Sequence, residues 1–97
     1  MAGRKASLSH EETERILDGL RRRPAIWPLL EEACLDSGLL PDEVIRLRTR
    51  RATEVRRSVL RAVRNELGLS YPEIGRLFGL DHTTVMVGVR AAGGAAA

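Results

Sequence analysis

The sequence predicts an all-α domain of four or five helices that ends in a helix-turn-helix. Apolar residues recur at helical spacing along most of the chain, and serine, aspartate, proline and glycine stand where helices begin or end. The 97 residues suit one small domain, and 43% hydrophobic content is ordinary for a globular chain. We expect a single helical domain over residues 9–91, with a flexible N-terminus at 1–8 and a flexible tail at 92–97.

The first helix is expected to begin at Ser7 or Ser9, because Ser9 and Glu12 have the spacing of a capping box. It should end at an arginine triplet followed by Pro24, since cations suit the C-terminal dipole and proline breaks a helix. A narrow apolar stripe runs along it, formed by Ile16, Leu17 and Leu20. The stripe packs either on the domain or on a second copy of the chain, so this helix is the candidate surface for a homodimer.

Two shorter helical segments are expected next. One begins between Ala25 and Pro28 and ends at Gly38, a typical C-terminal stop. The other is a short helical turn over residues 39–45. Cys34 is the only cysteine and has apolar neighbours, which indicates a small core residue. A single cysteine excludes an internal disulfide and fits a reducing cytosol.

A long basic helix is expected from about Ala52 to Leu67. Residues 46–97 contain ten Lys and Arg against four Asp and Glu, whereas residues 1–45 contain six against nine. Such a clustered positive charge is typical of a protein that binds a polyanion. The outer face of the long helix and the residues before it supply the candidates for DNA phosphate contacts: Arg51, Arg56, Arg57, Arg61 and Arg64.

Two short helices joined by a tight turn are predicted over residues 70–90. Ser70 is a good N-cap and Pro72 stands where a missing amide has no cost, so the first of the two begins near residue 71. Gly79 can take the left-handed conformation that ends a helix, and Asp81 is a good N-cap for the second. This is the pattern of a helix-turn-helix.

The second helix of this pair has an inward face and an exposed first turn. Val85 and Val89 lie one turn apart and face the interior. A helix-turn-helix inserts the first turn of its second helix into the major groove, where threonine methyls, hydroxyls, an imidazole or a carboxylate can contact base edges. We therefore expect base contacts from Asp81, His82, Thr83 and Thr84.

A specific motif runs through the same segment: Ile74-Gly75, then Phe78-Gly79, then the run Asp81-His82-Thr83-Thr84-Val85. This motif resembles the C-terminal DNA-binding domain of the bacterial chromosomal replication initiator DnaA, and the similarity extends over about residues 28–91. The resemblance implies that the aspartate, histidine and threonines of the run read bases in the major groove. It also implies double-stranded DNA as the partner.

The chain departs from that family at three places. The turn, Gly79-Leu80-Asp81, is one residue shorter than the family's and lacks its arginine. The family's Arg-Gln pair in the long helix is Arg57-Ser58 here, and its minor-groove arginine falls on Thr49. Because arginines suit a narrow minor groove, we expect Arg48 or Arg50 to take that role. These departures leave the target sequence open.

Several functional classes are excluded at this stage. No apolar run reaches the roughly 18 residues of a membrane span, and no signal-peptide core is present. Two distant histidines and one cysteine do not make a zinc site, and no nucleophile is placed beside a base. We expect no enzyme activity, no cofactor, no metal and no small-molecule substrate.

The expected function is sequence-specific binding of double-stranded DNA in the bacterial cytoplasm, at the nucleoid. The sequence has no Gly-x-x-x-x-Gly-Lys-Ser/Thr loop, so the ATPase module of the initiator is missing from it. We therefore expect a standalone regulator of replication or transcription at initiator-type sites. The alternative is a protein-interaction module that kept the fold and lost specific DNA recognition, which the shortened turn favours and the arginine cluster opposes.

Overall fold

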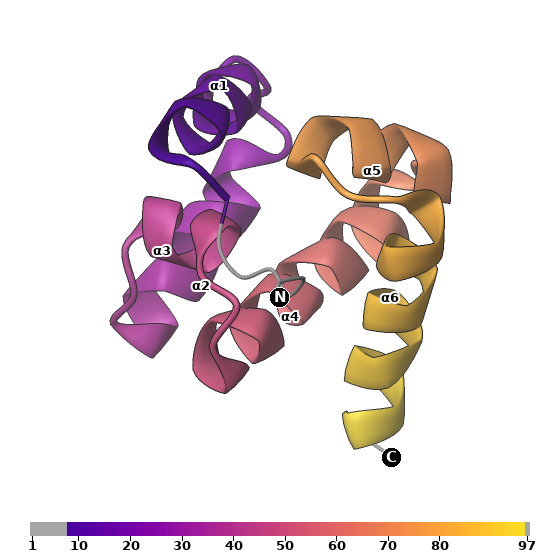
Figure 1. Cartoon of the computed structure of the whole chain (residues 1–97). Coiled ribbons are helices and arrows are strands. Elements are labelled where there is room, and N and C mark those ends of the chain that lie inside the picture. The colour runs from indigo at the N-terminus through magenta and orange to yellow at the C-terminus, as the bar shows by residue number, and fades with distance from the viewer. Residues whose placement is uncertain (1–7, 97) are drawn as a thin grey trace, which may run out of the picture.

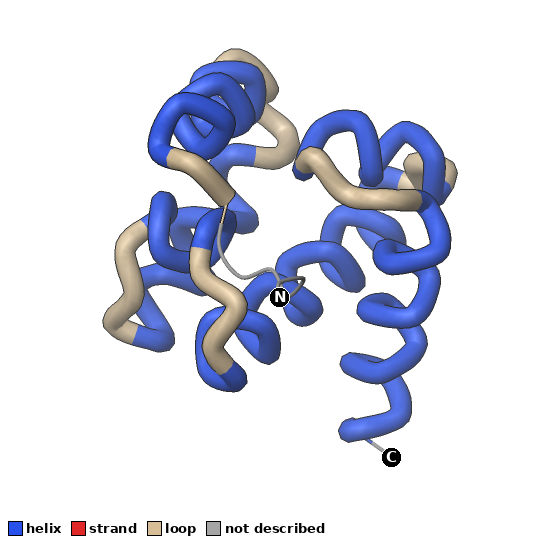
Figure 2. Tube along the Cα trace, in the orientation of Figure 1, coloured by secondary structure: helices blue, strands red, loops and turns tan. Residues whose placement is uncertain are grey.

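The computed structural model describes residues 8–96, and every regular element in that range is a helix (Figure 1, Figure 2). The predicted all-α class is confirmed. The described range holds six helices rather than four or five, because the short turn expected at 39–45 is a helix of its own. In chain order these are α1 (His10–Arg21), α2 (Trp27–Ser37), α3 (Pro41–Arg46), α4 (Arg50–Leu67), α5 (Tyr71–Phe78) and α6 (His82–Ala96).

The predicted capping box begins α1. The amide of Glu12 donates to Ser9 Oγ at 3.1 Å, and the amide of Ser9 donates to Glu12 Oε1 at 3.2 Å. The preceding residue, Leu8, already belongs to the fold, because its amide donates to the carbonyl of Arg46 at 3.2 Å. The flexible segment expected at 1–8 therefore does not include Leu8, and residues 1–7 lie outside the described residues.

The apolar stripe of α1 packs on the domain itself, against α3 and α5. Leu17 and Leu20 are fully buried, and Ile16 lies against the turn that follows α5, next to Gly79. Thr13 is also buried, and its hydroxyl donates to the carbonyl of Ser9 at 2.8 Å. The stripe considered as a homodimer surface is thus used within the chain.

Helix α4 lies in the middle of the fold and contacts α2, α3, α5 and α6 (Figure 1). It begins at Arg50 rather than near Ala52, because the amide of Ala52 donates to Thr49 Oγ1 at 3.2 Å and makes Thr49 the N-cap. Arg50 and Arg51 therefore lie in the first turn of α4, and not in the connection before it as expected.

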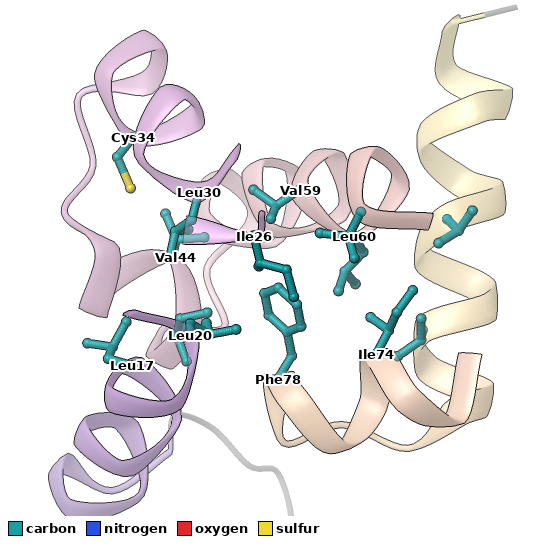
Figure 3. Close-up of a cluster of buried hydrophobic side chains, with 14 residues drawn as sticks. Leu17, Leu20, Ile26, Leu30, Cys34, Val44, Val59, Leu60, Ile74 and Phe78 are labelled. Atoms are coloured by element: carbon teal, nitrogen blue, oxygen red, sulfur yellow. The ribbon is translucent and has the colours of Figure 1, made fainter. Parts of the chain in front are cut away.

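One continuous core joins the helices. Phe78 of α5 lies near Ile26, which precedes α2, while Val59 and Leu60 of α4 line the same interior (Figure 3). Burying an aliphatic or aromatic side chain of this size stabilises a fold by about 1.5–3 kcal/mol. Because the core takes side chains from both ends of the chain, α5 and α6 are held against the rest of the domain rather than projecting from it.

Helix α6 is longer than the sequence predicts. The domain is expected to end at residue 91, with a flexible tail at 92–97, but the helix continues to Ala96. Alanine is the best helix former, and residues 91–96 contain four alanines and two glycines. The segment expected to be a tail is thus helical as far as Ala96, and residue 97 lies outside the described residues.

Two glycines shape the turn between α5 and α6. Gly79 ends α5 with a φ of +68°, as the sequence predicts. Gly75 lies inside α5, where a Cβ atom would stand 2.5 Å from the carbonyl oxygen of Leu80. The amide of Leu80 donates to the carbonyl of Gly75 at 2.8 Å. The chain therefore crosses directly over Gly75, and only a hydrogen atom fits at that position.

Alanine at Gly75 is expected to destabilise the protein by roughly 1–3 kcal/mol, because the new methyl group must displace backbone atoms of the turn. Gly19 is the matched control, since it also lies inside a helix but has open space around it. Alanine there is expected to stabilise by about 0.5–1 kcal/mol through helix propensity. Urea unfolding followed by far-UV circular dichroism measures both, and a gain for Gly75→Ala would contradict the close approach.

Candidate DNA-binding surface

Helices α5 and α6 form the predicted helix-turn-helix. The amide of Glu73 donates to Ser70 Oγ at 3.2 Å, and the amide of Ser70 donates to Glu73 Oε1 at 3.0 Å. The backbone amide of Ser70, followed by its hydroxyl, lowers the pKa of the Glu73 carboxyl by donating to its charged form. This capping box fixes where α5 begins, and the crossing at Gly75 fixes where α6 leaves it.

The first turn of α6 is exposed. Val85 and Val89 are buried on its inner side, as predicted, and the carbonyl of Asp81 accepts the amide of Val85 at 3.0 Å. Val87 is 50% exposed and lies one turn after Thr83 on the same side of the helix. The structure brings the four residues expected to contact bases together on this one exposed turn: Asp81, His82, Thr83 and Thr84.

A hollow of about 800 Å³ borders this turn on one side. Arg48, from the connection between α3 and α4, and Arg76, from α5, line it together with His82 and Thr84. Nη1 of Arg48 donates to the carbonyl of Ile45 at 3.1 Å, and partial burial lowers the pKa of Arg48. Two guanidinium groups from different elements therefore flank the exposed turn on this side.

A smaller hollow of about 230 Å³ borders the turn on its other side, between α4 and α6. Arg57 lines it together with Thr83 and Val87. The two helices approach closely at Gly88, where a Cβ atom would lie 3.3 Å from Cγ of Arg57. The aliphatic stem of Arg57 packs over Gly88 and leaves the side chain half-buried beside the exposed turn.

Arg56 has a structural role, and its burial argues against the phosphate contact expected of it. It is 6% exposed, and its Nη1 donates to the carbonyls of Val44 at 2.7 Å and Leu47 at 2.9 Å. Its Nη2 donates to Thr53 Oγ1 at 3.2 Å. Burial, followed by the charges of neighbouring arginines, lowers the pKa of Arg56 to about 10. The guanidinium ties the end of α3 to α4, and although the residue borders the smaller hollow, its hydrogen bonds within the protein leave little of it exposed to a phosphate.

Two further arginines expected to contact phosphate have partners within the protein. Nη1 of Arg64 donates to the carbonyl of Leu69 at 2.8 Å, and its guanidinium lies 4.5 Å from the ring centre of Tyr71. Arg51 donates to the carbonyl of Ser37 at the end of α2. Both side chains thus support connections between helices, and neither lines the two hollows beside α6.

The other predicted arginines differ in their surroundings. Arg50 is almost fully exposed and pairs with Glu54 at 3.6 Å, within the first turns of α4. Arg61 is half-buried and lies one turn after Arg57 along α4, the helix that packs against α6. Arg57 and Arg61 remain the candidates on α4 for DNA phosphate.

Arg76 is a candidate contact that the sequence pattern missed. It is exposed in α5 and lines the larger hollow together with Arg48. The available signal is its isolation, since it is the only lysine or arginine between Arg64 and Arg90 and stands five residues before Asp81. The sequence assigns α5 an apolar face, and only the crossing at Gly75 brings its opposite face beside the exposed turn of α6.

The family model described as "Bacterial dnaA protein helix-turn-helix" matches residues 36–91, which is more than half of the 97-residue chain. The chain belongs to the bacterial DnaA helix-turn-helix family. No curated protein and no solved structure matches it. Within this DnaA helix-turn-helix chain, the matched range holds α3, α4, α5 and α6 as far as residue 91, whereas α1 and nearly all of α2 precede it. The match begins eight residues later than the expected start at 28.

Membership in this family supports DNA binding through a helix-turn-helix and gives no role in catalysis. The geometry of the described residues adds two findings. No three His, Cys, Asp or Glu side chains in residues 8–91 are grouped so that they could hold a metal ion. None of the helices in the described part of the chain has the length and apolar character to cross a membrane.

Methionine at Arg56 is expected to destabilise the protein by roughly 2–4 kcal/mol, because it keeps an apolar stem but removes the donor of the buried Val44 carbonyl and one of the two donors to the Leu47 carbonyl. Arg61→Met on the same helix is the control, with an expected change within about 0.5 kcal/mol. Chemical unfolding of both variants measures the difference. Equal stabilities would show that the buried guanidinium has no structural role.

Proposed function

We propose that this protein binds double-stranded DNA sequence-specifically and regulates replication or transcription at initiator-type sites, within the bacterial nucleoid. The observation that carries the proposal is the exposed first turn of α6, which lies between two arginine-lined hollows. A turn of this kind enters the major groove, while the flanking cations bind the phosphates on either side. The family match supports the same mode of binding.

Base readout is assigned to the side chains of this turn. The methyl and hydroxyl of Thr83 and Thr84 suit a thymine methyl and a base-edge acceptor, and the imidazole of His82 can donate to a purine. The Asp81 carboxylate suits a cytosine amine. All four side chains are exposed, and together they supply donors, acceptors and methyl groups at neighbouring positions of the groove.

Affinity is assigned to the arginines that flank the turn. Arg57 and Arg61 stand on α4, Arg76 stands on α5, and Arg48 stands before α4. These four cations, three at phosphates and Arg48 in the minor groove, displace condensed counterions, so the logarithm of the association constant should fall with the logarithm of salt concentration at a slope of roughly −3.5. Arg51 and Arg64 are left out of this count because each bonds to a carbonyl of the protein and lines neither hollow, and Arg56 is left out because it is buried.

Minor-groove contact is assigned to Arg48 rather than to Arg50. Arg48 lies in the connection before α4 and lines the same hollow as His82, so it is continuous with the surface that reads the major groove. Arg50 lies in the first turn of α4 and pairs with Glu54. Arginines that enter a narrow minor groove favour A·T tracts, which have an enhanced negative potential.

A protein-interaction module that has lost DNA recognition is less well supported. The observation that favours this alternative is the shortened turn, where Leu80 stands and the family's arginine is missing. Leu80 is half-buried and packs against the core, and its amide bonds to Gly75. The replacement therefore serves the packing of the turn, and Arg76 supplies a positive charge beside it.

Thr83→Ala is expected to weaken binding to the preferred site by about 1–3 kcal/mol and to leave binding to a scrambled duplex unchanged, because the side chain contacts a base and no phosphate. Arg57→Ala is expected to weaken both and to reduce the salt slope by about one. Fluorescence anisotropy at several salt concentrations measures these changes. The duplexes are the A·T-rich box of the DnaA family, or a site selected from random DNA, and a scrambled sequence.

Three results of that titration would contradict the proposed function or the role of Thr83. Equal losses of Thr83→Ala on both duplexes would remove the residue from base readout. Equal, salt-sensitive binding of the wild-type protein to both duplexes would leave nonspecific binding only. No binding to either duplex would move the assignment to an interaction module.

Arg48→Ala is expected to reduce the preference for A·T base pairs beside the major-groove site, whereas Arg50→Ala should leave that preference unchanged, since Arg50 lies outside the hollow. Competition between duplexes that carry A·T or G·C pairs at the flank measures the preference. A larger effect of Arg50→Ala would reverse the assignment.

A further inference from the structure

An apolar hollow lies where α2 ends and α3 begins. Leu35 is 85% exposed and Leu40 is 61% exposed, and they are two of the three large hydrophobic side chains that are exposed in the described part of the chain. Cys34, Leu39 and Pro41 line the hollow with them, and its volume is about 480 Å³. An exposed leucine pair over a hollow of this size is typical of a surface that another protein covers.

Helix α2 carries three exposed carboxylates, one of which lines this hollow. Glu31 lines it, and Glu32 and Asp36 are exposed on the same helix. None of these three takes part in an ion pair with another described residue. Asp42 on α3 is partly neutralised by Arg46 at 3.8 Å. The excess negative charge near the hollow therefore comes from α2 and from Glu43 of α3.

The buried thiol beside the hollow responds to the same charge. Burial raises the pKa of Cys34, and the negative charges of Glu31, Asp42 and Glu43 raise it further. The hollow thus combines an apolar surface with a negative potential, a combination that repels nucleic acid phosphates and anionic lipid headgroups.

The hollow is remote from the surface assigned to DNA. Helices α2 and α3 lie on one side of α4, and α6 lies on the other (Figure 1). None of the residues that line the α2–α3 hollow lines either hollow beside the first turn of α6. A molecule that covers Leu35 and Leu40 therefore leaves the helix-turn-helix accessible.

We propose that the hollow formed by Leu35 and Leu40 is a docking site for a second protein, which inserts an amphipathic helix with apolar anchors and flanking lysines or arginines. Charge complementarity selects this occupant, because the apolar anchors fill the hollow while the cations approach Glu31 in its wall and the other exposed carboxylates of α2. The proposal does not rest on DNA binding. If both surfaces act, the protein places its partner beside DNA.

The probe is a fluorescein-labelled helical peptide built from leucine and lysine, with its leucines spaced to form one face. A matched peptide carries glutamate in place of lysine. The wild-type chain is expected to bind the lysine peptide at least about tenfold more tightly than the glutamate peptide. Leu35→Gln combined with Leu40→Gln should weaken that binding by about tenfold or more, because it removes the apolar anchors without a change of charge.

Two variants that each remove three carboxylates test the contribution of the negative charges on α2. Glu31→Gln, Glu32→Gln and Asp36→Asn together should weaken binding of the lysine peptide and flatten its salt dependence. The control variant removes three carboxylates elsewhere, at Glu11, Glu14 and Glu66, all of which are exposed. It should bind the peptide as the wild type does. The substituted side chains are exposed, so circular dichroism should show an unchanged fold for every variant.

Several outcomes would overturn the proposal. These are no binding of the lysine peptide, equal binding of both peptides, or an equal loss of peptide affinity in the α2 carboxylate variant and its control. A wild-type dimer in sedimentation velocity that Leu35→Gln with Leu40→Gln dissociates would assign the hollow to a second copy. Tighter peptide binding after removal of residues 1–7, which contain Arg4 and Lys5, would assign it to the chain's own N-terminal segment.

Discussion

The contact between Gly75 and Leu80 sets the geometry on which the rest of the DNA-binding surface depends. The Leu80 amide bonds to the Gly75 carbonyl at 2.8 Å, and the Leu80 carbonyl occupies the space that a side chain would take. This crossing fixes the direction in which α6 leaves α5. It also brings Arg76 of α5 beside His82 of α6. The same short turn thereby determines both the exposure of the base-contacting residues and the position of one flanking cation.

Helix α4 uses its arginines for two different purposes. Arg56 points inward and satisfies the carbonyls of Val44 and Leu47, where a neutral apolar residue would leave polar groups unpaired. Arg57 is the next residue in the chain, yet its stem packs over Gly88 and it borders the exposed turn of α6. A count of arginines along this helix therefore overestimates the number of cations that are free to bind phosphate.

The two halves of the sequence form surfaces of opposite charge. Carboxylates gather on α2 beside the leucine hollow, and arginines gather around the first turn of α6. Helix α4 separates the two surfaces, so α2 does not place its carboxylates against the arginine-flanked turn (Figure 1). The charge asymmetry of the sequence is thus a spatial separation in the fold. This separation allows one small domain to offer a polyanion-binding face together with an acidic, apolar one.

The sequence by itself determined the class, most of the helices and those of their ends that have a local cap. Serine and glycine caps such as Ser9, Ser70 and Gly79 act through hydrogen bonds and dihedral angles within a few residues, so they are readable without a fold. The same is true of the exposed run from Asp81 to Thr84, because Val85 and Val89 define the inner face of α6.

Only the tertiary structure decided which arginine side chains are free to contact DNA and in which direction they point. Arg56 and Arg57 are equally basic in sequence, and the difference between them is set by carbonyls of α3 and by the approach of α6 at Gly88. Arg76 joins the site through a turn that brings two helix faces together, and the stripe of α1 is covered by α3 and α5. Contacts between residues distant in sequence leave no local pattern, which is the physical reason that these features required the fold.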